Sequence, residues 1–526
     1  MRPLTAARAT LWAITTVVWL AVARLAAAFL RNELHWRYVA EQSRRDAPWY
    51  YRLAGVWGGS EGSLLLFAAV LALVASLAAR RMQRPVAVWF GTVTVAAVAL
   101  VDLLWASPFG ALDTPALRGF GMTPILEHPA MAVHPPLLYA GLACSLAAAM
   151  VVLDGGLPRA WLRRTLALVT LAMAIGGLWS YAEQGWGGYW AWDPVENTSL
   201  LVWLAAIVAL HAPARPRLGL AAWGFTLVGA CIVRSGATPS IHGFAEQASV
   251  GWALLAVLGA SAVAAAVLLP AGRFTIAPVA GLTSTADGRA GTRADVAGVA
   301  GVAGVAGVAV VAVSAVLLLV AAGTLLPVVI DLFADRPTVV RGEFFSRTVG
   351  PVAVVAMPFL VWRLRVPRAR LAHVGVLVLT LGIAASTFDR AAQVVVGPGQ
   401  TATAAGMEVV GGGVTVQPGP RTDVQAVVAT VVVDGFTMRP ALVAYPERGG
   451  VLAETAVVSR PWRDVQVTLL DANDAGVVRL IVRRRPLMWL VWLGALLTTA
   501  GALSPEWAER RRSRRPVEPA SSPATR

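Results

Sequence analysis

The sequence contains no lysine, so its 44 basic residues are all arginine. Charged residues of both signs are also scarce: they make up 14% of the 526 positions, whereas soluble globular proteins carry about a quarter. Hydrophobic residues account for 57% of the chain. This composition excludes an ordinary soluble enzyme and indicates a protein with many membrane spans. The net charge of +15 does not indicate nucleic-acid binding, because the arginines cluster at the ends of apolar runs.

Cysteine is nearly absent as well. The chain has two, Cys144 and Cys231, and both lie inside apolar runs. No CxxC or CxxCH motif occurs. The sequence therefore has neither a thiol–disulfide motif nor a covalent haem attachment site of its own, and we expect two buried, inert thiols.

Long apolar runs, in contrast, are abundant. A run of about 18 or more apolar residues is long enough to cross a bilayer core. Reading along the chain predicts about twelve transmembrane helices, near residues 10–30, 62–80, 86–106, 134–153, 163–182, 198–212, 217–234, 249–270, 304–332, 348–365, 370–388 and 486–504.

Arginine placement predicts the orientation of these spans, because cytoplasmic connections are enriched in basic residues. If both termini are cytoplasmic, the arginine clusters near 80–84, 159–164, 215–217 and 363–370 and the tail at 510–515 all fall on that side. The segment 31–61 disagrees, since it carries five arginines on the predicted outer side.

Residues 389–485 form the one long outer segment, and they alternate polar and β-branched residues between Gly and Pro turns. We therefore predict an all-α polytopic membrane protein with a small β-rich extracytoplasmic domain inserted before the last helix. The predicted parts are a transmembrane core at 1–388, the β-rich domain at 389–485, the last helix at 486–504 and a basic cytoplasmic tail at 505–526.

The stretch GWGGYWAWDPVENTSL at 185–200 concentrates Trp186, Tyr189, Trp190 and Trp192 with acidic residues at the outer mouth of a span. An aromatic belt at the membrane interface is one reading. Belts, however, are scattered over helix ends and need no carboxylates. A dense apolar surface flanked by acids is better suited to holding a planar hydrophobic ligand by stacking.

This segment resembles the tryptophan-rich (WWD) haem-handling signature of cytochrome c biogenesis proteins. Further motifs in the same order narrow the resemblance to the CcmF-type cytochrome c haem lyases: GVWGGSEGSLLL at 55–66, HPAMAVHPPLLYAG at 128–141, VRSGATPSIHGFA at 233–245, GTLLP at 323–327, GEFF at 342–345 and RLAHVGVLVLTLG at 370–382. The matches extend over most of residues 30–505. Two positions depart from the family pattern: Ser60 stands where many members have His, and Tyr189 where Trp is usual.

The resemblance implies a function in cytochrome c maturation. A protein of this kind accepts haem from a haem chaperone (CcmE-like) and promotes its thioether attachment to the CxxCH motif of apocytochrome c. Apocytochrome c itself and its thiol-reducing or presenting proteins (CcmH-like) are the other implied partners, with membrane lipid and a candidate quinol electron donor, and no nucleic acid. The implied location is the inner (plasma) membrane of a bacterium, with the active face extracytoplasmic.

Two histidines are expected near the cytoplasmic side. His211 lies 19 residues after Trp192, or about 28 Å along a helix, and His373 lies near the start of a span that runs outward from Arg370. Two imidazoles at matching depth on different helices can clamp a haem b between them. The alternative is a pair of helix-end histidines that face water or headgroups.

His134 and His242 are expected at the opposite face, where both could flank the tryptophan platform. By resemblance, they are the two axial ligands of a haem held transiently there, and the alternative is a pair of loop histidines that hydrogen-bond to solvent. The predicted site residues are Trp186, Trp190, Trp192 and Asp193 for the platform, with His134, His242, His211 and His373 for haem iron. His35 and His128 are expected to be surface or interface residues.

Asp193 and Glu196 have two readings: orientation of an imidazole, or capping of the following span, since Asp193-Pro194 is a favourable helix start. Arg234 likewise could pair with a haem propionate or extend to the interface as an ordinary arginine. The main functional alternative is a membrane protein that transports or loads haem without a bond-forming role. We would expect such a protein to have about six spans and no large soluble insert.

Overall fold

The computed structural model describes residues 2–183, 188–240, 242–243, 246–269, 293–331, 333, 338, 340–363, 370–419, 421, 424–445 and 450–504. Each of the twelve predicted spans contains a helix in this part of the chain. The helices are α1 (Arg2–Leu30), α4 (Ser60–Ala79), α5 (Pro85–Trp105), α6 (Pro129–Leu153), α7 (Arg159–Glu183), α8 (Pro194–His211), α9 (Gly219–Ser235), α10 (Ala248–Leu268), α11 (Arg293–Asp331), α12 (Gly342–Arg363), α13 (Arg370–Ala385) and α14 (Trp489–Leu503).

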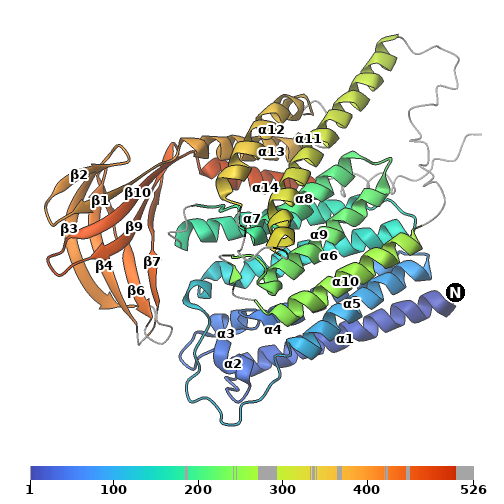
Figure 1. Ribbon diagram of the computed structural model, residues 1–526, viewed down its shortest axis with the longest axis horizontal. Helices are drawn as coiled ribbons and strands as arrows, with labels where there is room; N and C mark the ends of the chain where they lie inside the picture. Colours follow the sequence, from blue (N-terminus) through green and yellow to red (C-terminus); the bar gives the residue numbers. More distant parts are fainter. Residues whose placement is uncertain are drawn as a thin grey trace, which may run out of the picture.

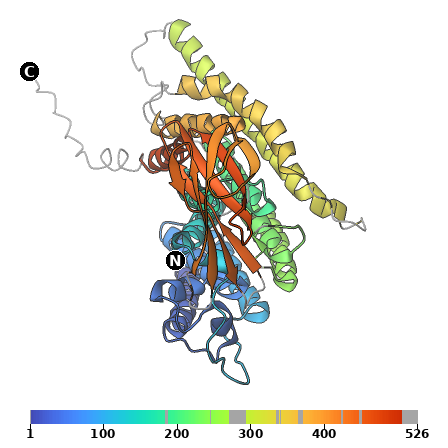
Figure 2. The ribbon, with the colours of Figure 1, turned by 90° about the vertical axis from the view of Figure 1, so that its left-hand side faces the viewer.

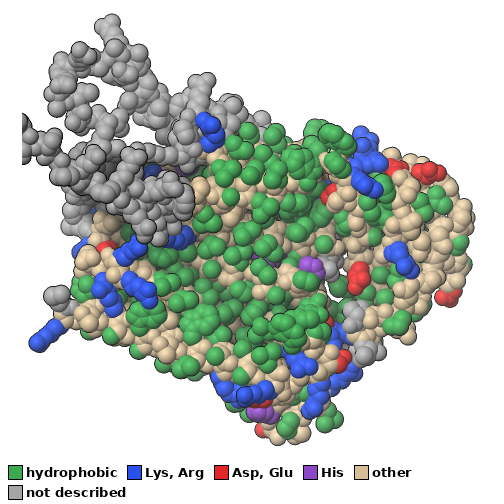
Figure 3. Space-filling model, turned by 180° about the vertical axis from the view of Figure 1, so that it is seen from behind, with side chains coloured by type: hydrophobic (Ala, Val, Ile, Leu, Met, Phe, Trp, Pro, Cys, Tyr) green, Lys and Arg blue, Asp and Glu red, His purple; other side chains and the backbone are tan. Residues whose placement is uncertain are grey.

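Ten segments in the described part are long and apolar enough to cross a membrane, and α14 is a shorter apolar helix. Hydrophobic side chains cover the helical body, whereas charged side chains gather toward its ends and on the β-rich part (Figure 3). The chain is therefore a multi-pass membrane protein, as the composition predicts. The N-terminus and the β-rich part lie at opposite ends of the helical body (Figure 1).

Short helices occupy the connections at the end of the helical body that carries the β-rich part, which is called the outer end below: α2 (Arg37–Gln42), α3 (Trp49–Gly55) and the 3₁₀ turn η1 (Pro124–Leu126). Two more 3₁₀ turns, η2 (Pro216–Leu218) and η4 (Ser386–Phe388), precede α9 and follow α13. Local sequence accounts for several helix boundaries. Proline opens α5, α6 and α8, where its missing N–H would have no partner anyway, and Gly236 ends α9 with a φ of +63°.

The predicted β-rich domain is a sandwich of two sheets. Its strands are β1 (Arg390–Val396), β2 (Thr401–Ala404), β3 (Met407–Pro418), β4 (Gln425–Val433), β5 (Phe436–Met438), β6 (Ala441–Tyr445), β7 (Gly450–Glu454), β8 (Ala456–Ser459), β9 (Arg463–Ala472) and β10 (Val478–Pro486). One sheet has the order β1-β10-β9-β8 and the other β2-β3-β4-β6-β7, with β5 paired to β4. The alternating valines of β4, β9 and β10 fill the core between them. The predicted fold class is confirmed.

Helices α13 and α14 lead directly into the paired strands β1 and β10, where Arg390 stands opposite Arg484. The two helices approach so closely that a Cβ at Gly375 or Gly501 would overlap the backbone of the other helix. Small residues permit such close packing between membrane helices. The helix pair and the strand pair therefore form one continuous hairpin that passes from the helical body into the sandwich.

The sandwich also docks on the outer connections of the helical body. Arg421 lies 2.8 Å from Glu127, and Arg44 contacts the same carboxylate at 3.1 Å. All three side chains are at least 90% buried. At a second contact, the Tyr181 hydroxyl donates to Asp464 at 2.7 Å. Figure 2 shows the sandwich from its outer side, extended across the helices behind it.

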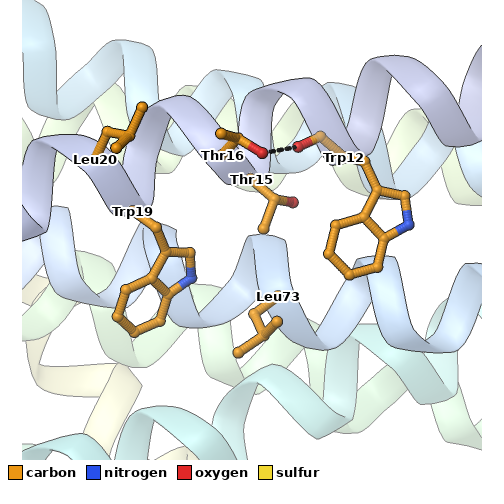
Figure 4. Close-up of a pocket in the computed structure, with 6 residues that line it drawn as sticks. All are labelled: Trp12, Thr15, Thr16, Trp19, Leu20 and Leu73. Atoms are coloured by element: carbon orange, nitrogen blue, oxygen red, sulfur yellow. Dashed lines mark hydrogen bonds between the residues drawn. The ribbon is translucent and has the colours of Figure 1, made fainter.

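A groove of about 500 Å³ lies on α1 where this helix packs against α4. The rings of Trp12 and Trp19 point from α1 toward Leu73 and frame the groove, and Thr16 donates to the Trp12 carbonyl between them (Figure 4). Leu20 at its edge is 64% exposed. None of the predicted site residues lines this groove, which belongs to the apolar surface along the sides of the helices.

Candidate haem-binding sites

The first candidate site is the pair formed by His211, the last residue of α8, and His373 in the first turn of α13. Their ring centroids lie 6.0 Å apart, and the rings are inclined at 85°. The Nδ1 of His211 is hydrogen-bonded to the Ile207 carbonyl at 2.9 Å. Two imidazole nitrogens bound to one metal ion at about 2 Å each place their ring centroids roughly 6 Å apart. The distance between the two rings therefore matches that of two imidazoles bound to one metal ion.

The sequence predicted that these two residues lie at the same depth. Tertiary packing is what brings their rings close together. His373 follows Ala372, whose backbone packs against Gly501 of α14. Contacts of α14 with α7, and of α7 with α8, then link this helix pair to the helix that carries His211. Close packing of α13 on α14 therefore sets the position of one imidazole relative to the other.

The second candidate site lies at the outer end of the helices, where His242 meets Asp193. Asp193 Oδ1 accepts hydrogen bonds from the Ser240 hydroxyl at 2.9 Å and from the backbone N–H of Val195 at 2.8 Å, and it contacts His242 Nδ1 at 3.2 Å. Its side chain is 5% exposed, and that of His242 is 33% exposed. A buried carboxylate thus fixes one nitrogen of a ring that remains partly accessible.

Asp193 also begins α8, so the two readings of this residue hold together. Glu196 Oε2 accepts from the backbone N–H groups of Ala191 at 2.9 Å and of Asp193 at 3.2 Å, which completes a capping box. The cap holds the last residues of the tryptophan segment against the first turn of α8. Capping and orientation of His242 are therefore carried out by one side chain.

The tryptophan segment is organised by ring contacts. Trp192 stacks on Phe345 of α12 at 5.1 Å with an interplanar angle of 11°, and its indole N–H donates to Ser346 Oγ at 3.0 Å. Trp190 packs edge-on against Trp192 at 5.9 Å. Trp192 has a φ of +57°, a conformation that costs roughly 1–3 kcal/mol for a residue other than glycine. Trp186 lies outside the described residues.

On the other side of this segment, Tyr189 contacts the η4 turn and helix α14, which adjoin the sandwich. Its hydroxyl is 3.1 Å from Ser386 Oγ, and its ring packs against Trp492 of α14 at 6.3 Å. Burial raises the pKa of the Tyr189 phenol, so the group stays protonated and available for hydrogen bonding. The segment is therefore held between α12 on one side and the α13–α14 hairpin on the other.

His134 on α6 lies against α7. Its Nδ1 is 2.8 Å from the Ala172 carbonyl, and a Cβ at Gly176 would come within 2.6 Å of its ring. Gly176 thus leaves the space that the imidazole occupies. His134 lies near the start of α6, and His242 lies in the loop after α9, where it contacts Asp193 at the start of α8. The structure therefore brings both predicted outer histidines to the same end of the helices.

Sequence reasoning missed two neighbours of His134. Trp179 packs edge-on against His134 at 6.3 Å and stacks on His128 at 5.8 Å with an angle of 4°. Burial lowers the pKa of His128, which favours its neutral ring, and its Nδ1 accepts the N–H of Ala130 to cap α6. His128 is therefore part of an aromatic cluster with Trp179, and its position in the HPAMAVHPP motif was the sequence signal that could have indicated this.

The structure contradicts one of the two sequence-based readings of Arg234, the arginine that extends to the interface. It is 4% exposed and donates to the Ser60 carbonyl at 3.3 Å and to Ser63 Oγ at 3.2 Å. Ser60, to which the sequence assigned no role, is thus an acceptor for a buried guanidinium. Because Arg234 packs among α4 residues, it is not an arginine that extends from the helix end to the interface.

Comparisons with known proteins now bear on these sites. Residues 157–234, which include the described part of the tryptophan segment, match the family model of the cytochrome C assembly protein. The probable cytochrome c-type biogenesis protein NrfE of Escherichia coli is 31% identical over 74% of each chain. The chain belongs to the CcmF-type cytochrome c biogenesis family.

Two further comparisons add detail. The cytochrome c-type biogenesis protein ccl1 of Rhodobacter capsulatus is 34% identical, over 64% of this chain and 53% of that relative's length. A solved structure named cytochrome c heme lyase CcmF matches with a TM-score of 0.66 and 21% identity, over 95% of this chain and 91% of that one. The latter likeness shows the shared fold. This CcmF-type chain therefore functions in cytochrome c maturation, as the sequence motifs predict.

Proposed function

We propose that this CcmF-type protein is the haem-lyase component of cytochrome c maturation. It accepts haem from a CcmE-like chaperone and presents it to the reduced CxxCH thiols of apocytochrome c, which CcmH-like proteins keep reduced and deliver. The reaction takes place on the extracytoplasmic face of the bacterial inner membrane. The single observation that carries the proposal is the approach of the His211 and His373 rings to 6.0 Å.

The inner pair would hold a resident haem b through one nitrogen of each ring. When bound there, a haem would supply an electron store for keeping incoming haem iron ferrous, with quinol as the candidate donor. His211 is oriented by the Ile207 carbonyl on its Nδ1, which leaves Nε2 as the ligand atom. His373 is positioned by the packing of α13 on α14.

The outer residues would bind the haem that is the substrate. His134 and His242 serve as its axial ligands, and Trp186, Trp190 and Trp192 form the surface on which the porphyrin rests. Asp193 holds the ring of His242 in one orientation, as carboxylates do for other metal-binding histidines. His134 is held in the same way by the Ala172 carbonyl.

The proposed reaction depends mainly on how the haem and the substrate thiols are oriented relative to each other. Each substrate thiol adds across one vinyl group of the haem: a carbon–sulfur bond forms, and the thiol proton goes to the other vinyl carbon. The thiolate is the nucleophile, so both cysteines must be reduced. A haem held by two histidines and a rigid aromatic surface presents its vinyl edge in one orientation, which lowers the entropic part of the barrier.

The alternative is a protein that only transports or loads haem. Such a protein would have no need of a folded domain over its outer site. Here the sandwich contacts the helical body through buried groups at Glu127 and Tyr181, on either side of the His128–Trp179 cluster. The placement of the sandwich therefore favours the lyase proposal.

The test is the haem content of the purified protein and of four variants, His134→Ala, His211→Ala, His242→Ala and His373→Ala. We expect wild type to carry a low-spin haem b spectrum that anaerobic redox titration follows, and His211→Ala and His373→Ala to lose it. His134→Ala and His242→Ala should keep the resident haem but fail to capture haem from the loaded chaperone. A wild-type protein without haem b, or an unchanged His373→Ala spectrum, would refute the inner site.

A further inference from the structure

The tip of the β8–β9 hairpin presents a surface that the haem sites do not use. Its sequence is Arg460-Pro461-Trp462-Arg463, and Ser459 pairs with Asp464 at its base. Trp462 is 80% exposed, which makes it an unusually exposed large aromatic for a folded domain. Arg463 is paired with Asp434 at 2.7 Å, whereas Arg460 lies exposed over the Phe436 ring.

This tip is bonded directly to the first turn of α14. The Trp489 indole N–H donates to the Pro461 carbonyl at 2.7 Å, and the N–H of Leu487 donates to the Trp462 carbonyl at 3.3 Å. Because the apolar helix α14 starts at Trp489, these hydrogen bonds place the tip at the depth where that helix begins. In membrane proteins that depth is the headgroup region of the bilayer.

The neighbouring surface is apolar and continuous with the lipid-facing side of the helices. Trp489, Leu493 and Leu496 are 46%, 37% and 55% exposed at helical spacing on α14. Phe388, at the outer end of α13, is 76% exposed. The row of exposed apolar side chains on α14 therefore continues into Trp462 at the hairpin tip.

We propose that the hairpin tip, residues 460–463, is a phospholipid-headgroup binding site that rests in the outer leaflet. Trp462 lies at the boundary between headgroups and acyl chains, where the amphipathic indole is most favourable. Arg460 meets the lipid phosphates. A protein partner would leave Trp462 equally exposed here, but the bonds to the start of α14 and the continuous apolar stripe favour lipid.

The tip would act as the membrane support of the sandwich. The sandwich is bonded to the outer loops at Glu127 through Arg421, and the tip lies at its other attachment, beside α13 and α14. Lipid contact there would stop the sandwich from tilting about the α13–α14 hairpin. The sandwich would then stay in one position over the tryptophan segment.

The test is the bilayer depth of a spin label on Ser459, the exposed residue beside the tip. Both native cysteines are buried, so a Ser459→Cys variant is labelled selectively. The protein is reconstituted in vesicles of phosphatidylethanolamine and phosphatidylglycerol, and power saturation compares accessibility to oxygen and to a nickel chelate. The matched control is Val395→Cys on β1, which is 61% exposed on the same sandwich.

We expect Ser459→Cys to report headgroup depth and Val395→Cys to report water. Adding Trp462→Glu to the Ser459→Cys variant should raise nickel accessibility at least severalfold, with the haem b spectrum unchanged. Equal nickel accessibility at both positions would overturn the proposal. So would a label at 459 that is shielded from both reagents, because that result indicates a protein contact. The readout is independent of haem binding, so its failure leaves the proposed function unaffected.

Discussion

At the scale of single residues, the outer site depends on Asp193, which has three hydrogen-bonding neighbours for one carboxylate. It caps α8 through Val195, receives the Ser240 hydroxyl and holds His242. Sequence reasoning offered capping and imidazole orientation as alternatives for this residue. The structure combines them because the loop after α9 returns to the start of α8.

Asp193→Asn separates the two roles. Asparagine caps helices as well as aspartate, so α8 should keep its start. The neutral amide no longer holds His242 through a carboxylate hydrogen bond, and we expect about a tenfold loss in affinity for chaperone-delivered haem. Haem transfer titrated against the loaded chaperone measures the effect. The resident haem b spectrum should stay unchanged, and its loss would indicate misfolding instead.

Asp389, just outside the last residue of η4, predicts a pH dependence. Burial raises its pKa to about 6, although Arg485 and Arg483 act in the opposite direction. The unfolded value is about 3.9, so the native state binds the extra proton between these pH values. Stability therefore falls as pH rises from about 4 to about 6.

Thermal unfolding of the detergent-solubilised protein measures this slope. Asp389→Asn stays neutral in both states, so its unfolding temperature should vary less than that of wild type across the same range. Identical pH profiles for the two proteins would contradict the raised pKa. Other carboxylates titrate in this window as well, so the difference between the two profiles, and not the wild-type slope alone, is the result.

At the scale of elements, the α13–α14 pair carries the inner site. His373 stands next to Ala372, whose backbone lies against Gly501. Sequence reasoning predicted both spans and the depth of His373. It did not predict this contact, because a glycine in an apolar run gives no sign of which helix approaches it.

Gly501→Ala tests this contact. The added Cβ overlaps the Ala372 backbone, so α13 must shift and carry His373 away from His211. Overpacking of this kind costs about 1–3 kcal/mol, and we expect partial or complete loss of the haem b spectrum in the purified protein. The control is Gly259→Ala on α10, where an added Cβ meets nothing within 4 Å. Full haem content in Gly501→Ala would show that α13 position does not limit the inner site.

At the scale of the whole molecule, the sandwich is held over the outer face by a buried charge network. Glu127 accepts from Arg421 and Arg44, and Arg44 also lies 2.9 Å from Asp46. Arg44 belongs to the segment that disagreed with the positive-inside pattern. Its burial against two carboxylates gives a physical reason why an arginine here need not indicate the cytoplasmic side.

Arg421→Ala should loosen this attachment. Removing one partner of a buried ion pair lowers the free energy of unfolding by several kcal/mol. Because Glu127 keeps its contact with Arg44, we expect the free energy of unfolding to fall by roughly 3 kcal/mol, at the lower end of that range. Faster hydrogen exchange in residues 118–131 and in β6 would report the release. The control is Arg479→Ala, which breaks an exposed pair with Asp471 and should cost less than about 1 kcal/mol. Similar effects of the two substitutions would contradict a docking role for Arg421.

Composition and patterning alone determined the membrane class, the spans, the β-rich insert and the family, because hydrophobic length, alternation and ordered motifs are local properties of the chain. Helical rise from Trp192 and the position of Arg370 likewise predicted a matching depth for His211 and His373. Tertiary structure decided the approach of their rings, the dual role of Asp193, the cluster of Trp179 with His128 and His134, and the pairing of Arg421 with Glu127. These contacts join residues on separate elements, and which faces of those elements meet depends on packing that no local pattern specifies.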